Sequence, residues 1–220
     1  MQQSGTPCPF IKMFTTLLGG ECVIFALDCS STVSDDNLEK EIHFVQQLAQ
    51  SWNVSMEVKV IVYGHDAETL SLAPGNKQLF YYRLQELRSN WAGSKNRRID
   101  FALNVAAQIL TTSAQRAHSQ QVVILVTAGG QQSDAQKKEE DHELLLDAQE
   151  KLSNESIKVI LVPVGLHTDF RELGLIVKRP QSLYPLSGFN AMTPDRAQSI
   201  VDNIKKTLGE CRCRFAFNYM

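Results

Sequence analysis

A fully apolar stretch over residues 23–27 ends abruptly in Asp28, and the hydroxyl residues Ser30, Ser31 and Thr32 follow within four positions. An unbroken apolar run of this length is typical of a central parallel strand that is buried on both faces of its sheet. In open α/β sheets, ligands bind in the crevice at the carboxyl ends of such strands. Because hard cations take oxygen ligands, these side chains indicate one part of a cation site.

From Cys22 onward, short apolar runs alternate with helical periodicity, which is typical of a parallel sheet covered by helices. We expect the first strand at the centre of a doubly wound, mostly parallel sheet, with one short antiparallel strand at an edge near 68–72. Ser34 and Thr193 are expected to cap the first and last helices. The strands are predicted over 23–28, 57–63, 121–127 and 157–164, with weaker candidates over 68–72 and 182–186. The helices are predicted around Leu38–Ala49, Phe80–Leu87, Ile99–Ile109, Leu145–Leu152, Leu173–Val177 and Ile200–Leu208.

A chain of 220 residues is long enough for one well-buried α/β domain and too short for two of ordinary size. We expect an irregular lead-in over 1–20, a domain over 21–211 and a tail over 212–220. The net charge of -2, with both signs interspersed, argues against nucleic acid or an anionic membrane as the main partner. No apolar run approaches the roughly 20 residues that span a bilayer. The lead-in also lacks the basic region of a signal peptide.

Cysteines lie mainly toward the two ends of the α/β pattern, an arrangement that suits bridges clamping the ends of the domain in an oxidising compartment. The alternative is a set of free cytosolic thiols. Two sequons, at Asn53 and Asn154, fit a secreted glycoprotein. The five cysteines are Cys8, Cys22, Cys29, Cys211 and Cys213.

Five segments, in this order and spacing, resemble the von Willebrand factor type A domain over about residues 21–211. They are residues 23–32, 93–103, 122–130, 162–166 and 170–173. The Phe-Ala-Leu-Asp sequence that ends at Asp28, the basic segment 94–98 and the cysteine-rich tail look most like the A domains of collagen VI chains. The resemblance implies a Rossmann-like α/β fold.

Many members of this family hold a divalent cation through an Asp-x-Ser-x-Ser loop, a Thr before the third helix and an Asp after the fourth strand. Asp28 and Ser30 match that loop, and Thr32 keeps the hydroxyl of its second Ser. The family's Thr falls on Arg97 and its second Asp on Ala128. A guanidinium about 4 Å from a dication costs several kcal/mol even at an effective dielectric constant of about 20. We therefore interpret this adhesion site as degenerate, with no metal and no other cofactor.

Arg97 and Arg98 precede a predicted helix, and the helix dipole disfavours cations at that end unless an anion lies nearby. The hypothesis is that Arg97 neutralises Asp28 in place of a metal, and that Arg97 or Lys95 lies closest to that carboxylate. In the alternative, Arg97 points into solvent and backbone amides satisfy Asp28.

Other residues carry no recognisable catalytic pattern. The five histidines have no metal or triad spacing, and Gly129-Gly130 is not part of a phosphate-binding motif. We expect Cys29 to be a small buried residue, and Tyr81, Tyr82 and Trp91 to belong to the core.

The first strand and the last helix of such a fold meet at its bottom face. We therefore expect Cys22 to pair with Cys211 or Cys213, and Cys8 to pair with the remaining one. Cys29, at the opposite face, should stay free.

The sequence and its resemblance together favour a secreted, non-enzymatic binding module of the extracellular matrix that acts by metal-independent contact with proteins. The resemblance implies partners such as collagens, other matrix proteins or sister chains of an assembly, with neither nucleic acid nor membrane insertion. One alternative is a metal-dependent adhesion domain in which Mg²⁺ bridges Asp28, Ser30 and Thr32 to a ligand carboxylate. A nucleotide-dependent enzyme is disfavoured, because bulky residues rather than glycines follow the first strand.

Overall fold

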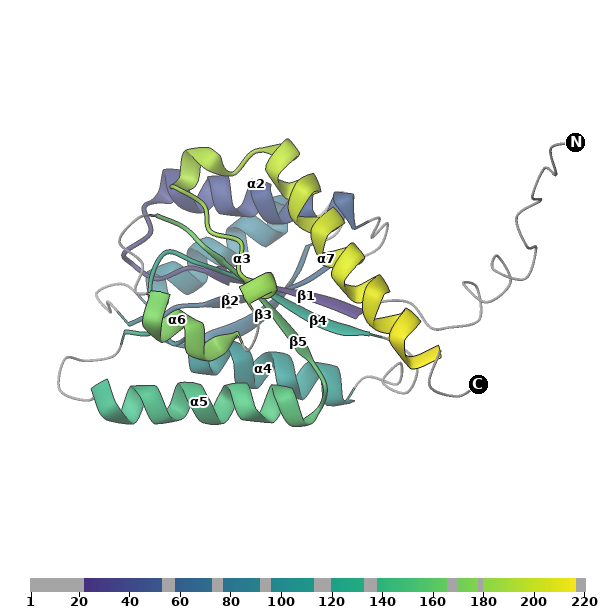
Figure 1. Ribbon diagram of the computed structural model, residues 1–220. Coiled ribbons are helices and arrows are strands. Elements are labelled where there is room, and N and C mark those ends of the chain that lie inside the picture. The colour runs from purple at the N-terminus through teal and green to yellow at the C-terminus, as the bar shows by residue number, and fades with distance from the viewer. Residues whose placement is uncertain are drawn as a thin grey trace, which may run out of the picture.

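The computed structural model describes residues 22–52, 58–72, 77–91, 96–112, 120–132, 138–165, 170–177 and 180–216. These residues form one sheet with helices on both faces (Figure 1). The strands are β1 (Cys22–Asp28), β2 (Val58–Tyr63), β3 (Ala67–Leu72), β4 (Gln121–Thr127) and β5 (Lys158–Pro163). The helices are α2 (Asp35–Ser51), α3 (Lys77–Asn90), α4 (Ile99–Thr112), α5 (Lys138–Asn154), α6 (Phe170–Ile176) and α7 (Pro194–Ala216).

The strand order is β3-β2-β1-β4-β5, which places β1 at the centre of the sheet. All neighbouring strands are parallel except β2 and β3, which are antiparallel. The predicted central strand and the antiparallel edge are therefore both confirmed. Helical crossovers between the parallel strands account for the alternation seen in the sequence.

The predicted strand over 182–186 is wrong as a continuous strand. It makes only two isolated bridges to the region of β5, Leu161 with Leu183 and Val164 with Leu186. The amide of Tyr184 donates to the Leu161 carbonyl and that of Leu186 to the Pro163 carbonyl, both at 2.9 Å. Between these bonds a parallel ladder needs an amide from residue 163, and Pro163 has none. The imino acid of β5 therefore interrupts the pairing.

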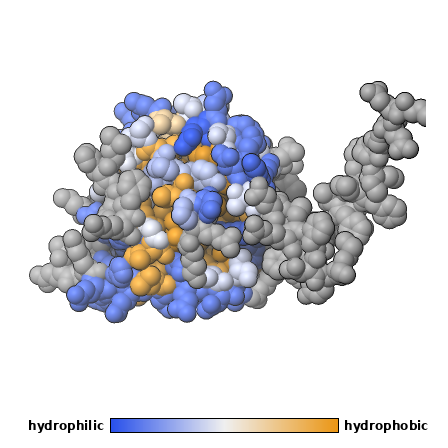
Figure 2. All heavy atoms as spheres, in the orientation of Figure 1, coloured by the Kyte–Doolittle hydropathy of each residue, from blue (hydrophilic) through white to orange (hydrophobic). Residues whose placement is uncertain are grey.

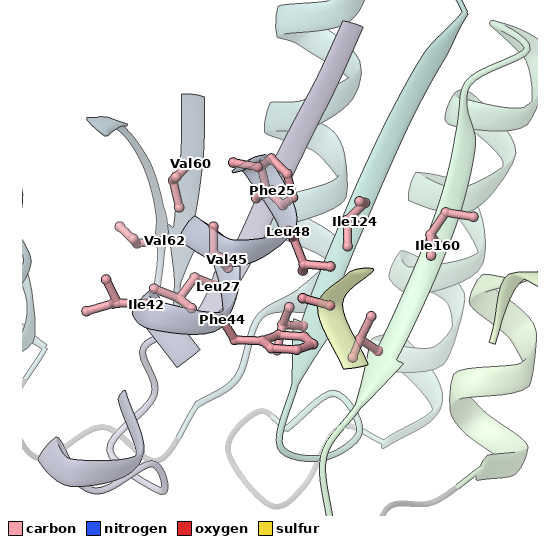
Figure 3. Close-up of a cluster of buried hydrophobic side chains, with 14 of the residues drawn as sticks. Phe25, Leu27, Ile42, Phe44, Val45, Leu48, Val60, Val62, Ile124 and Ile160 are labelled. Atoms are coloured by element: carbon pink, nitrogen blue, oxygen red, sulfur yellow. The ribbon is translucent and has the colours of Figure 1, made fainter. Parts of the chain in front are cut away.

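Both faces of the sheet are buried, which explains why its strands are apolar without alternation. On one face Phe25 and Leu27 pack with α2 and α7, and Figure 3 shows α2 side chains such as Val45 and Leu48 near those of β1, β2 and β4. On the other face Ile24 belongs to a second core cluster formed with α4 and α5. The two clusters together make β1 the buried centre of the domain.

Two predicted helix caps are present. The Ser34 hydroxyl accepts a 3.3 Å bond from the Asn37 amide at the start of α2. The Thr193 hydroxyl accepts one of the same length from the Arg196 amide at the start of α7. The lead-in over 1–20 and the sequon at Asn53 lie outside the described residues. Within the part of the chain that the structure describes, no helix is long and apolar enough to cross a membrane.

Candidate functional site

Asp28 lies at the carboxyl end of β1 with no exposed surface. One carboxylate oxygen, Oδ1, accepts a bond from the Ser30 amide at 3.0 Å. The other, Oδ2, accepts one from the Ala128 amide at 3.1 Å, in the loop that follows β4. The neighbouring parallel strands β1 and β4 end at the same edge of the sheet, so their loops meet around this carboxylate.

The Arg97 side chain reaches the same carboxylate, and only 7% of it is exposed. Its Nε donates to Asp28 Oδ2 at 2.6 Å. One terminal nitrogen donates to the Gly130 carbonyl at 3.2 Å, and the other donates to the Thr32 hydroxyl. Thr32 in turn lies 2.8 Å from the Ser30 hydroxyl, oxygen to oxygen. The predicted pairing of Arg97 with Asp28 is confirmed, and the solvent-facing alternative for Arg97 is wrong.

The backbone holds Arg97 in place at a short antiparallel bridge with Gln132. The Arg97 amide donates to the Gln132 carbonyl at 2.7 Å, and the Gln132 amide donates back at 3.0 Å. All five predicted site residues, including Ala128 through its amide, are thus brought together. Lys95, the alternative cation, lies outside the described residues.

Gly129 makes room for the guanidinium, a role that the sequence did not reveal. A Cβ atom at this position would overlap a terminal nitrogen of Arg97 and lie 3.2 Å from its Cζ. The carbonyl of the same glycine accepts a 2.6 Å bond from the Thr127 hydroxyl, which orders the loop. The available signal was the glycine pair that follows Ala128 after β4, a pair that the sequence ties to the family resemblance and not to a phosphate-binding motif.

A second buried carboxylate, Glu41 on α2, was not predicted. It is fully buried, and neither of its oxygens has a hydrogen-bond partner among the described residues. Burial raises the pKa of Glu41 well above its usual value and the charge of Asp28 adds to this, while Arg97 and Arg88 oppose it. The sequence carried a signal, because position 41 lies in the apolar stripe beside Ile42.

Cys29 is buried and free, as predicted. Burial raises the pKa of its thiol to about 12, so it is not a reactive thiolate at neutral pH. The side chains of the four cysteines expected to form bridges, Cys8, Cys22, Cys211 and Cys213, lie outside what the structure describes. Their pairing stays a prediction.

The second arginine before α4 is also paired. Arg98 donates to both carboxylate oxygens of Asp100, at 2.8 and 2.6 Å, and its Cζ lies 3.7 Å from the centroid of the Phe101 ring. Asp100 supplies the local anion that the helix start requires. Of the aromatic residues assigned to the core, Tyr81 and Trp91 pack against it, but Tyr82 is 68% exposed, so its assignment was wrong.

The fold and site together define a doubly wound α/β domain in which the direction of winding switches between β1 and β4, at whose carboxyl ends Asp28 lies. The model of the von Willebrand factor type A domain matches residues 23–203, and the chain belongs to this family. Such domains serve as adhesion and protein-interaction modules. A search of curated proteins finds no match.

Solved structures with this fold include proximal thread matrix protein 1 from the mussel byssus, with its MIDAS motif occupied by zinc (17% identity, TM-score 0.64). The alignment covers 84% of this chain and 48% of the mussel chain, so this chain spans about half the length of that relative. The manganese-loaded TRAP protein of Plasmodium vivax is 18% identical, with a TM-score of 0.58 and coverage of 83% and 72%. An aerotolerance-related membrane protein from Bacteroides fragilis is 18% identical, with a TM-score of 0.61 and coverage of 85% and 100%. These comparisons do not point to collagen VI chains in particular.

The residues at this strand end do not fit the divalent cation that the family implies. Arg97 donates to both Asp28 and Thr32, the groups that would have to ligate a metal. Ala128 offers no side-chain ligand in the loop after β4. Among the described residues, no three His, Cys, Asp or Glu side chains come together as a metal site.

Proposed function

We propose that this chain is a protein-binding module of the extracellular matrix that contacts its partners without a bridging metal ion. The observation that supports this most is the buried ion pair of Arg97 with Asp28, at 2.6 Å. In a metal-dependent adhesion domain, a carboxylate of the ligand completes the coordination of the bound metal. Here the Arg97 guanidinium occupies the carboxylate of Asp28, so a ligand would not bind in that way. Affinity would then come from a desolvated anchor cluster with a polar rim.

The partners that fit this proposal are collagens, other matrix proteins or sister chains of an assembly. Secretion is supported by the sequon at Asn154, which lies exposed at the end of α5, and by the expected cysteine bridges at the ends of the domain. Glycosylation at Asn154 and the cysteine bridges both fit a secreted chain in an oxidising compartment. No catalytic activity is proposed, because the site contains no activated nucleophile and no base poised beside one.

The competing function is metal-dependent adhesion. For a cation to bind, Arg97 would have to leave Asp28, Thr32 and the Gly130 carbonyl and expose a carboxylate that has no exposed surface. Removing one partner of such a buried pair costs about 3–5 kcal/mol. The cation would have to recover this cost before it bound at all.

Surface plasmon resonance of the whole chain over purified collagens, matrix glycoproteins and the chain itself tests the proposal. The same injections are made in Mg²⁺ and in EDTA. We expect at least one partner to bind with the same affinity in both buffers. Binding that disappears in EDTA would establish the metal-dependent reading instead, and no binding to any matrix protein would count against a matrix function.

A further inference from the structure

A groove lies at the outer edge of β5, far along the sheet from the Asp28 site. Its volume is about 530 Å³, within the roughly 300–1,000 Å³ typical of ligand pockets. The apolar part of its lining comes from α5, the turn that follows it, β5 and α7, and includes Leu152, Ile157, Val159, Ile204 and Leu208. Figure 2 shows hydrophobic residues gathered on the face of the molecule where β5 lies between these helices.

The groove also contains backbone and side-chain groups that lack partners. In a strand, the backbone N–H and C=O groups of every second residue point toward the same edge. In β5 the carbonyls of Leu161 and Pro163 point to the outer edge, where they accept bonds from segment 183–186. Val159 faces the same edge, and no backbone hydrogen bond from the described part of segment 180–186 reaches it. The Oε1 of Gln120, which lines the groove, is buried without a hydrogen-bond partner among the described residues. An added strand at this edge would supply partners for these groups.

An apolar segment precedes β1 in the sequence, close enough along the chain for its reach to be compared with the position of this groove. Cys22 is paired with Gln121, and Val122 with Lys158, so β1, β4 and β5 all begin at the end of the sheet where the groove lies. A position beside β5 is about three strand spacings, or roughly 14 Å, from the start of β1. Residues 17–21, fully extended, span about 17 Å. The stretch that they would deliver, over residues 10–16, contains Phe10, Ile11, Met13 and Phe14.

We propose that the apolar lead-in segment over residues 10–16 docks in the β5 groove of its own chain and extends the sheet at Val159. The tether favours this occupant over a free peptide, because a short linker gives an effective concentration in the millimolar range. It also fits better than a second copy. A second copy could offer its edge strands, β3 and β5, only at its free concentration in solution, whereas the tethered segment is present at millimolar effective concentration.

Hydrogen exchange of the whole chain, read by mass spectrometry, tests this proposal. Phe10→Ser combined with Phe14→Ser should make the amides of residues 158–161 exchange about tenfold faster, which corresponds to about 1.4 kcal/mol of lost docking energy. The matched control, Gln2→Ser combined with Gln3→Ser, should leave these amides unchanged. The amides of β1 and β4 should keep their protection in both variants, which shows that the domain stays folded.

A peptide of residues 8–20 added to the Phe10/Phe14 variant should restore the protection of the β5 amides. Equal exchange in the two variants, or no restoration by the peptide, would overturn the proposal. Protection that rises with protein concentration would show that a second copy occupies the groove instead.

Discussion

Replacing Arg97 and Asp28, singly and together, measures how strongly the two side chains of the buried ion pair depend on each other. A strong dependence is expected if Arg97 takes the place of a metal, and a weak one if it lies there incidentally. Arg97→Met leaves the carboxylate of Asp28 buried with only two backbone amides, and Asp28→Asn leaves the guanidinium without its anion. Each change should lower the free energy of unfolding by about 3–5 kcal/mol, the cost of isolating one member of a buried pair. The double variant should lose much less than the sum, with a coupling energy of about 2–3 kcal/mol. Urea unfolding of the four proteins measures this.

The matched control is the exposed pair of Arg83 and Glu86, whose Nη1–Oε2 distance is 2.8 Å and whose side chains are about half exposed. Because solvent screens such a pair, the same cycle there should give no more than about 0.5 kcal/mol. A coupling energy for Arg97 and Asp28 as small as that of the control would refute the reasoning.

Three further outcomes are expected. Gly129→Ala should destabilise the chain by about 1–3 kcal/mol in urea unfolding because it displaces Arg97, whereas Gly174→Ala in α6, with open space around it, should not. Between about pH 5 and 7 the free energy of unfolding of the wild-type chain should fall by up to about 1.4 kcal/mol per pH unit, because the raised pKa keeps Glu41 protonated in the folded chain while its carboxyl ionises in the unfolded chain. Glu41→Gln should remove this slope in urea unfolding, and an equal slope in the variant would contradict the explanation. Cys29 should resist thiol reagents at pH 8 until the chain unfolds, and rapid labelling of the folded chain would contradict its burial.

The order and direction of the strands followed from patterns that act locally. β1 and β4 are buried on both faces, so their sequences are apolar throughout and predict a central parallel sheet. The failed strand over 182–186 shows the limit of such patterns. The feature that interrupts its pairing, Pro163, lies in the neighbouring strand rather than in the segment itself.

The pairing at the site was predictable because charge and alignment pointed to the same residue. Arg97 stands where the family has a ligand, and an isolated cation at a helix start needs an anion. Glu41 and Gly129 were missed because their roles depend on neighbours far away in the chain. A glutamate on a helix is usually solvated, and Glu41 is fully buried because it lies on the apolar stripe of α2. The need for a glycine at position 129 appears only once the guanidinium is in place.

Calorimetric titration with Mg²⁺ and Mn²⁺ tests the central claim most directly. The wild-type chain should show no binding tighter than about 1 mM. The variant that combines Arg97→Thr with Ala128→Asp removes the guanidinium and adds a carboxylate beside Asp28, and it should bind the divalent ion. Wild-type binding tighter than about 1 mM would contradict the claim that Arg97 has taken the place of the metal.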